Sequence, residues 1–332
     1  MTRKINNSYL LGQSNAPTTG GDMLKIRIDG TPVWEEVDGF EYINKWFGGR
    51  GIFTGVRGAG VENIDYITIN TTGNATDFGD LTEGRFNLSG CSNNSRGVFG
   101  GGSGDSTVIN LIDYITISTP GNATDFGDLL NAPYGPGACS DGTTGIWAGG
   151  LVDDTTHQDI IQYITISTTG NAIDFGDLTL AREYFEACSD GTKGIFAGGY
   201  GAAAGNGHNT IDYITISTTG NALDFGDLTD TYYGAACTSD TTRAVTGGGR
   251  KAGTQVNNIE YFTMATTGNS SDFGDLTVTR VYFSACSDAT KAVFGGGYNP
   301  AVNTMDYITI QTTGNATDFG DLSNTGRGTA AA

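Results

Sequence analysis

The chain has 332 residues, of which 53 are glycine and only 16% are charged, with a formal net charge of −19. Aromatic and β-branched residues are too frequent for a disordered chain and favour an all-β protein. The negative charge argues against nucleic acid and anionic lipid surfaces as partners. No apolar run approaches 18 residues and no signal-peptide stretch is evident, so we expect a soluble protein without membrane insertion.

Residues 1–46 do not share the pattern of the remaining chain and form the first predicted domain. In residues 21–37, "GDMLKIRIDGTPVWEEV", an alternating segment, a DGTP turn and a second apolar segment predict a β-hairpin. We interpret residues 1–46 as an arm that anchors the protein to other proteins. The apolar residues expected to carry that contact are Leu24, Ile26, Trp34 and Trp46.

Residues 47–332 form the second predicted domain and consist of one unit repeated six times. The tyrosine of its DYITI segment falls at Tyr66, Tyr114, Tyr163, Tyr213, Tyr261 and Tyr307, at spacings of 46 to 50 residues. This period, with several short strands per unit, is typical of propeller blades. The sequence therefore predicts a six-bladed β-propeller.

Residues 184–228 show how one unit divides into four strands. Turn signals separate strand A (YFEACS), strand B (GIFAGGY), strand C (IDYITIST) and strand D (LDFGDL), which predicts an antiparallel meander. Strand A appears in full only five times, and the C-terminal residues align with it. We expect residues 328–332 to pair with the strand near Gly51 and to close the ring, which leaves only short, protected edges.

The constant segments are interpreted as scaffold. The six DFGD phenylalanines are expected to fill the gaps between blades, and the flanking aspartates to accept backbone N–H groups in turns. The acidic residues before the repeated tyrosine (Asp65, Asp113, Asp212, Glu260 and Asp306) are interpreted as solvated turn residues, with cation binding as the alternative. The five cysteines share one slot of the repeat, without a CxxC pair, and are interpreted as small buried hydrophobes. We expect no metal site and no cofactor.

The connections differ in how much they vary among the six copies. The A–B and C–D turns barely change, whereas the B–C loops and D–A connections, which a meander places at one end, vary freely. Because binding usually belongs to variable loops on a rigid scaffold, we expect the irregular face to bind partners. The candidate residues are Tyr134, Asp153, Asp154, His157, His208, Tyr232, Tyr233, Arg250 and Lys251.

These candidates are of two kinds. Tyr134, Tyr232 and Tyr233 are interpreted first as packing residues at the rim, with stacking on sugar rings as the alternative. His157 and His208, in B–C loops of adjacent blades, are interpreted as exposed loop residues, with a metal or catalytic pair as the alternative.

An enzyme is not the favoured interpretation. The chain has no P-loop, GxSxG or HExxH motif and no GxGxxG after a strand. A glycosidase needs two carboxylates about 5–9.5 Å apart. The carboxylates that break the repeat, Glu83, Asp153, Asp154, Glu183 and Glu186, stand in no recognisable motif. A glycan-binding or glycan-degrading propeller remains the alternative to a non-enzymatic protein.

The repeat resembles the kelch motif at several positions. The matching features are the glycine pair Gly198-Gly199, the aromatic residues Tyr213 and Phe225, and an arginine shortly after strand D. The arginine slot holds Arg85, Arg182 and Arg280, is broken by Pro133 and Tyr232, and is shifted by one at Arg327. Phenylalanine replaces the tryptophan typical of the family. This likeness implies a kelch-like propeller and says little about activity.

A second resemblance concerns the arm and the blade sequence. The pattern G-D-x-L-x…D-G-x-x-x-W resembles a short module near the N-termini of bacteriophage tail-fibre and virion proteins. The DYITI–TTGNATDFGDL unit is similar to repeats in virion structural proteins of marine phages. The likeness implies a multi-copy virion component, made in the bacterial cytoplasm: a tail-fibre, adhesin-like or decoration protein. Its arm would bind other virion proteins, and its loop face a host-surface glycan or protein, or neighbouring subunits.

Overall fold

A computed structural model describes residues 49–55, 62–93, 95–104, 107–153, 155–201, 207–298, 300–326 and 328–332, together with the backbone of β1 (Asp22–Ile26) and β2 (Pro32–Glu36). The chain divides into two compact units, Met1–Asn44 and Lys45–Ala332. In the first unit, β1 and β2 pair in antiparallel fashion with Leu24 opposite Trp34, so the predicted hairpin is confirmed. Trp46 lies outside the described residues.

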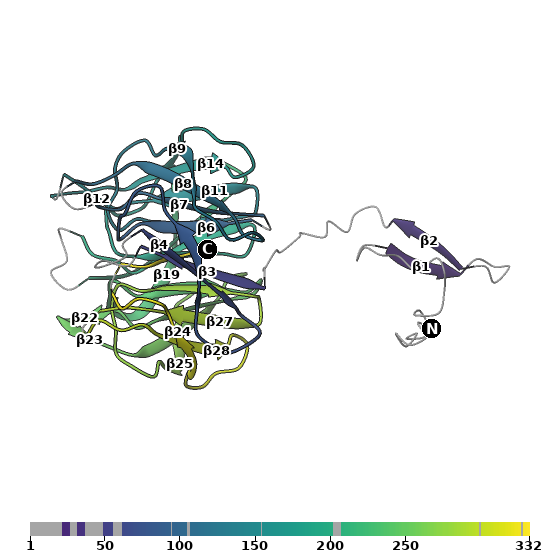
Figure 1. Cartoon of the computed structure of the whole chain (residues 1–332). Coiled ribbons are helices and arrows are strands. Elements are labelled where there is room, and N and C mark those ends of the chain that lie inside the picture. Colours follow the sequence, from purple (N-terminus) through teal and green to yellow (C-terminus); the bar gives the residue numbers. More distant parts are fainter. Residues whose placement is uncertain are drawn as a thin grey trace. The chain divides into compact units, whose positions relative to one another are not determined.

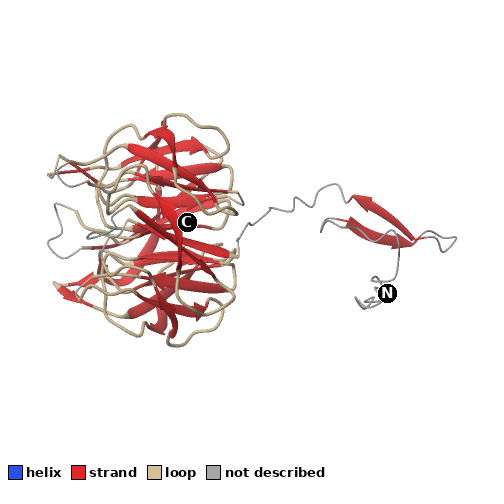
Figure 2. Ribbon diagram, in the orientation of Figure 1, coloured by secondary structure: helices blue, strands red, loops and turns tan. Residues whose placement is uncertain are grey.

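The second unit is a six-bladed β-propeller of four-stranded antiparallel blades, as predicted (Figures 1 and 2). Written from strand A to strand D, the blades are as follows. Blade 1 is β30 (Ala330–Ala331), β3 (Arg50–Thr54), β4 (Asn63–Thr68) and β5 (Thr76–Asp80). Blade 2 is β6 (Ser89–Ser92), β7 (Arg96–Gly100), β8 (Leu111–Thr116) and β9 (Thr124–Asp128). Blade 3 is β10 (Gly137–Ser140), β11 (Thr144–Ala148), β14 (Ile160–Thr165) and β15 (Ile173–Asp177).

Blade 4 is β16 (Glu186–Ser189), β17 (Lys193–Ala197), β18 (His208–Thr215) and β19 (Leu223–Tyr232). Blade 5 is β20 (Ala236–Ser239), β21 (Arg243–Gly247), β24 (Asn258–Thr263) and β25 (Ser271–Asp275). Blade 6 is β26 (Ser284–Ser287), β27 (Lys291–Gly295), β28 (Thr304–Thr309) and β29 (Thr317–Asp321). Among the described residues, no helix is long and apolar enough to span a bilayer.

The ring is closed by a blade that the two ends of the propeller share. The C-terminal strand β30 pairs with β3, with Thr54 opposite Ala330 and Phe53 opposite Ala331 (Figure 1). Ile52 and Ala332 exchange two backbone hydrogen bonds of 3.0 and 3.1 Å. The predicted closure is therefore confirmed, and the missing strand A of blade 1 comes from the end of the chain.

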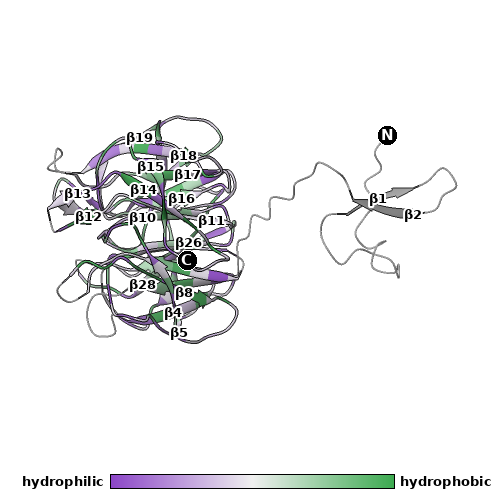
Figure 3. Cartoon of the chain, turned by 90° about the horizontal axis from the view of Figure 1, so that it is seen from above, coloured by the Kyte–Doolittle hydropathy of each residue, from purple (hydrophilic) through white to green (hydrophobic). Residues whose placement is uncertain are grey.

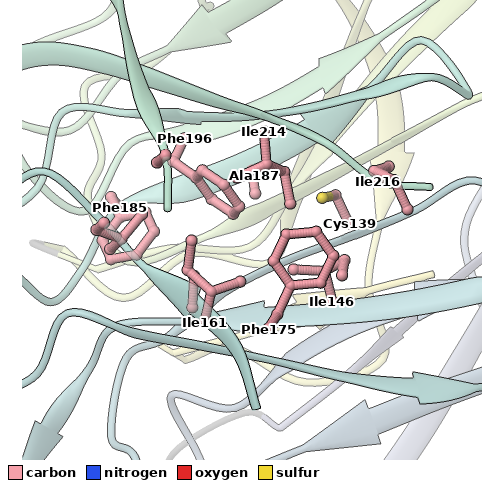
Figure 4. Packing of buried hydrophobic residues seen from close by; sticks show 12 residues of the cluster. Cys139, Ile146, Ile161, Phe175, Phe185, Ala187, Phe196, Ile214 and Ile216 are labelled. Carbon is pink, nitrogen blue, oxygen red and sulfur yellow. The ribbon is translucent and has the colours of Figure 1, made fainter. Parts of the chain in front are cut away.

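The hydrophobic core lies between neighbouring blades. Figure 4 shows the junction of blades 3 and 4, where Ile161 and Phe175 pack with Phe196 and Ile214. Each strand-C tyrosine stands edge-on to its strand-D phenylalanine, with ring centroids 5.9–6.0 Å apart. The hydrophobic residues are concentrated in the strands (Figure 3). The prediction that the repeated phenylalanines fill the gaps between blades is thus confirmed.

The DFGD segments join each blade to the next through the backbone. At the first junction Gly121 donates its N–H to the Phe78 carbonyl and Ala123 donates to the Asp80 carbonyl, both at 2.7 Å. The same pair of bonds recurs at all six junctions. A Cβ on Gly79 would lie 2.5 Å from the Gly121 carbonyl, so only glycine permits this approach.

The prediction that the DFGD aspartates accept backbone N–H groups in turns is wrong for most copies. In the described part of the chain, Asp125 alone of the twelve accepts a backbone N–H within its own segment, from Gly127 at 3.1 Å. The caps lie in the A–B turns instead. There Asp141 accepts the N–H groups of Thr143 and Thr144 at 2.8 and 2.7 Å, and the next three blades repeat the arrangement.

The acidic residues before the repeated tyrosine are buried, so their interpretation as solvated turn residues is wrong. Asp113, Asp212 and Asp306 are 0% exposed, and each forms an ion pair of 2.7–3.0 Å with a fully buried arginine from the preceding D–A connection. The arginines are Arg85, Arg182 and Arg280. Buried charges need partners, which explains why the two residue types recur together.

Basic residues at the start of strand B also serve the scaffold. Arg50 stacks on the Tyr66 ring, 4.6 Å from its centroid, and donates to the Ile117 carbonyl of the next blade at 2.7 Å. Equivalent contacts are made by Arg96, Lys193, Arg243 and Lys291. With these and the core arginines assigned, Arg250 and Lys251 are the remaining basic residues of the described propeller. The five cysteines are buried and free, as expected.

Candidate functional site

The B–C loops and D–A connections meet on one side of the propeller, which we call the loop face. Wherever both segments are described, an isolated β-bridge joins a D–A connection to the B–C loop of the blade that it enters. Examples are Tyr134 with Leu151 and Tyr233 with Arg250. Two B–C loops carry extra hairpins, β12 (Leu151–Val152) with β13 (Thr156–His157), and β22 (Arg250–Lys251) with β23 (Thr254–Gln255) (Figure 1). The predicted contrast between an irregular and a uniform face is confirmed.

At the centre of the loop face, one residue from each D–A connection joins a closed circle of backbone hydrogen bonds, the mouth ring. Each N–H donates to the carbonyl of the member before it, over 2.7–2.9 Å. Every member has a left-handed backbone, with φ between +53° and +78°. In chain order the members are Asn87, Gly135, Tyr184, Gly234, Tyr282 and Gly328.

Glycine alternates with a larger residue around the mouth ring for a steric reason. A Cβ on Gly135 would lie 2.9 Å from the Tyr184 ring, and one on Gly328 would lie 2.1 Å from Asn87 Oδ1. The ring therefore has room for three side chains but not for six. Left-handed backbone at a non-glycine residue costs on the order of 1–2 kcal/mol, and such strain is concentrated at functional sites.

Aromatic rings continue outward from the mouth ring in an unbroken series of contacts, the aromatic collar. Tyr184 lies 4.7 Å from Tyr282 and 5.4 Å from Tyr134, measured between ring centroids. Tyr233 lies 5.3 Å from Tyr200 and 6.3 Å from Tyr282. The members are Phe86, Tyr134, Tyr184, Tyr200, Tyr233 and Tyr282, all half-buried. Tyrosine presents an apolar ring and a polar hydroxyl, a combination that suits binding surfaces.

One carboxyl group lies within this aromatic surround. Glu183 is 5% exposed, and its backbone exchanges two hydrogen bonds with Tyr200 of 2.7 and 2.8 Å. Its Oε1 lies 3.7 Å from Nε2 of His157, whose ring is 5.9 Å from that of Tyr200. Burial raises the pKa of Glu183 to about 8 and lowers the pKa of His157. At neutral pH the pair is therefore mainly a protonated carboxyl beside a neutral imidazole.

The two histidines are not the exposed loop residues that the sequence suggested. His157 belongs to β13, and its side chain is 13% exposed. His208 is the first residue of β18, opposite Tyr232, and is half-buried. Burial lowers the pKa of His208, and the nearby Arg182 and His157 lower it further. Of the two, His157 has both ring nitrogens buried without a hydrogen-bond partner among the described residues.

The other predicted binding residues lie in different surroundings. Tyr134 and Tyr233 belong to the aromatic collar. Tyr232 is 6% exposed and occupies the arginine slot of blade 5, where its hydroxyl accepts a hydrogen bond from Asn258, so its assignment to the surface is wrong. Lys251 pairs with Asp230 at the exposed edge of β22.

Of the remaining candidates, Arg250 donates to the Gly253 carbonyl within the β22–β23 hairpin. Asp153 is exposed at the β12–β13 turn. Asp154 lies outside the described residues. The side chains of Leu24, Ile26 and Trp34, proposed for anchoring, are likewise not described.

Sequence reasoning missed Tyr184, Tyr282 and Tyr200 and considered Glu183 only as a possible catalytic acid. For Tyr184 and Tyr282 a signal was present, because glycine alternates with a larger residue from blade to blade two positions before the first strand of each blade. No group of three His, Cys, Asp or Glu side chains able to hold a metal occurs in the described ranges. The aromatic collar and the Glu183–His157 pair thus combine apolar ring faces with a protonated carboxyl group.

Comparisons with known proteins add no family to this description. A scan against protein-family models found no match, and a search of curated proteins found none either.

Proposed function

We propose that this chain is a non-enzymatic structural and recognition protein of a bacteriophage virion, a tail-fibre, adhesin-like or decoration component. Residues 1–46 attach it to other virion proteins, and the loop face binds the host surface or a neighbouring subunit. The observation that carries the recognition role is the aromatic collar, which gathers six aromatic side chains on the loop face. The virion assignment rests on the likeness of the arm and the repeat to phage proteins.

The energetic pattern also supports recognition. The side chains of the aromatic collar are half-buried and held on a rigid closed ring, so little conformational entropy is lost when they meet a partner. The strained Tyr184 and Tyr282 are kept at the centre of that face although glycine would relieve their backbone strain. Binding residues on a rigid scaffold are the usual design of a recognition surface.

The test separates attachment from recognition. Particles are assembled with the full chain, with a chain lacking residues 1–46, and with Tyr233→Ser in the full chain. We expect the truncated chain to fold but to be absent from particles, whereas Tyr233→Ser incorporates normally and adsorbs less to host cells. Incorporation of the truncated chain at the full-length level would refute the anchoring role. Normal adsorption by the Tyr233→Ser particles would refute recognition by the collar.

A further inference from the structure

Glu183 breaks the repeat at a position where the other described blades place an apolar or aromatic side chain. Its equivalents are Phe86, Tyr134, Tyr233 and Val281, each of which forms the same type of bridge to a B–C loop. Among the described blades, only blade 4 therefore has a carboxyl group at this bridging position of the loop face. A buried carboxyl costs stability unless its hydrogen bonds are made, so packing alone gives no reason for glutamate here.

The hydrogen-bonding capacity around Glu183 is unused within the described chain. Its Oε2 and both ring nitrogens of His157 have no hydrogen-bond partner, and the 3.7 Å between Oε1 and Nε2 is too long for a direct bond. The Glu183 side chain is only 7% exposed. Each unmade bond of a buried polar group costs roughly 1–3 kcal/mol. These atoms therefore form a preformed set of donors and acceptors for a guest.

The chemistry of the surroundings selects the guest. A hydroxyl group both donates and accepts, so it can bridge a protonated carboxyl and a neutral imidazole. Tyr200 offers an apolar ring beside this pair, because its ring lies 5.9 Å from that of His157 and its backbone bridges Glu183. The net charge of −19 disfavours an anionic ligand. A metal ion is disfavoured because no third ligand joins the pair in the described part of the propeller.

We propose that Glu183, His157 and Tyr200 form a binding subsite for one ring of a neutral, hydroxyl-rich glycan. A sugar hydroxyl is held between the Glu183 carboxyl and the His157 imidazole, and the less polar face of the sugar packs against Tyr200. This inference rests on the proposed function, because it names the ligand class that the loop face recognises.

The test uses the full chain and an array of neutral hexose and N-acetylhexosamine oligosaccharides, followed by calorimetric titration with the best-bound sugar. Glu183→Ala removes both carboxyl oxygens and should weaken binding about 10- to 100-fold, the effect of losing one or two neutral hydrogen bonds. Glu183→Gln keeps a donor and an acceptor and should bind within a few-fold of wild type. Glu83→Ala, at an exposed glutamate of another D–A connection, is the matched control and should change nothing.

His157→Ala provides a second variant on the other side of the bridge and should lose affinity to a similar extent. Failure of every neutral sugar to bind the wild-type chain would overturn this proposal, as would unchanged affinity in Glu183→Ala and His157→Ala. Neither result would decide the anchoring role in the proposed function, because incorporation of the arm-deleted chain into particles does not depend on sugar binding. Conversely, a chain without residues 1–46 could still incorporate into particles and still bind sugar. That result would refute the anchoring role but would support the subsite.

Discussion

The buried ion pair between Arg85 and Asp113 allows a quantitative test of how the blades are joined. Both side chains are 0% exposed, and their charged atoms lie 3.0 Å apart. Arg85 also donates to the carbonyls of Gly101, Glu83 and Phe99 over 3.0–3.3 Å. Burial lowers the pKa of Arg85, while Asp113 opposes that shift. We therefore expect each partner to be tolerated only because the other is present.

The perturbation is a double-mutant cycle with Asp113→Asn and Arg85→Met. Asp113→Asn leaves a buried cation without a counter-charge, and Arg85→Met leaves a carboxylate held only by Thr82, so each should cost about 3–5 kcal/mol of unfolding free energy. The double variant removes both charges and loses mainly the bonds to the carbonyls, about 2–4 kcal/mol in total. The coupling energy should therefore exceed about 2 kcal/mol.

The chain contains a natural version of this double change. Blade 3 has Pro133 in the arginine slot, and there the acidic residue is replaced by Gln162, which is 1% exposed. Both charges are thus absent together. Gln162→Glu should destabilise the propeller by about 2–4 kcal/mol, because it adds a buried carboxylate that keeps the Leu130 N–H as a donor but has no counter-charge. Urea unfolding followed by fluorescence measures all four variants, and additive effects in the cycle would refute the reasoning.

Three further predictions concern the mouth ring, the buried acid and the closing strand. Gly234→Ala should lower stability by about 1–3 kcal/mol in thermal melts, because the added Cβ would lie 2.5 Å from Val281 and the backbone φ is +65°. Gly121→Ala is the control and should have little effect, because the space around Gly121 is open. Because burial raises the folded-state pKa of Glu183 to about 8 from an unfolded value near 4.5, its contribution is fully present below about pH 4.5 and is lost as pH rises to about 8. Relative to Glu183→Gln, the wild type should therefore lose roughly 2–5 kcal/mol over that window, and parallel stability curves would contradict the assignment. Deletion of residues 329–332 removes the two hydrogen bonds between Ile52 and Ala332 and should lower the free energy of unfolding by at least about 2 kcal/mol. It should also expose the edge of β3 and promote association, which size-exclusion chromatography detects. An equally stable monomer would contradict closure by β30.

The fold could be predicted because the repeat states the same local information six times. The spacing of the tyrosines indicated the blade number, and the incomplete strand A near Gly51 indicated closure by the C-terminal residues. Period-2 alternation and glycine turns are local signals, so a single blade was sufficient to assign its strands.

The errors arose where a residue's partner lies in another part of the chain. Asp113 looks like a turn acid until Arg85, 28 positions earlier, is placed beside it, and Tyr232 looks like a loop residue until it fills the equivalent space in blade 5. An internal signal existed, because Pro133 and Gln162 change together in the same repeat. Of the three tyrosines predicted for the loop face, Tyr134 and Tyr233 lie in the aromatic collar, whereas Tyr232 is buried.

The mouth ring was beyond local pattern recognition. Its hydrogen bonds join residues from six separate connections, and the steric need for glycine at Gly135, Gly234 and Gly328 appears only when neighbouring blades are packed. Glu183 was noticed as a repeat-breaking carboxylate, but its burial and its approach to His157 depend on the β12–β13 hairpin of the preceding blade.

The central claim is that the loop face binds the ligand and the opposite face does not. Hydrogen–deuterium exchange of the full chain, with and without host-cell surface polysaccharide, tests this claim most directly. We predict slower exchange at the mouth ring and in the β12–β13 and β22–β23 hairpins, with no change in the TTGNAT turns of the opposite, uniform face. Protection of the TTGNAT turns, with the mouth ring unaffected, would contradict this assignment.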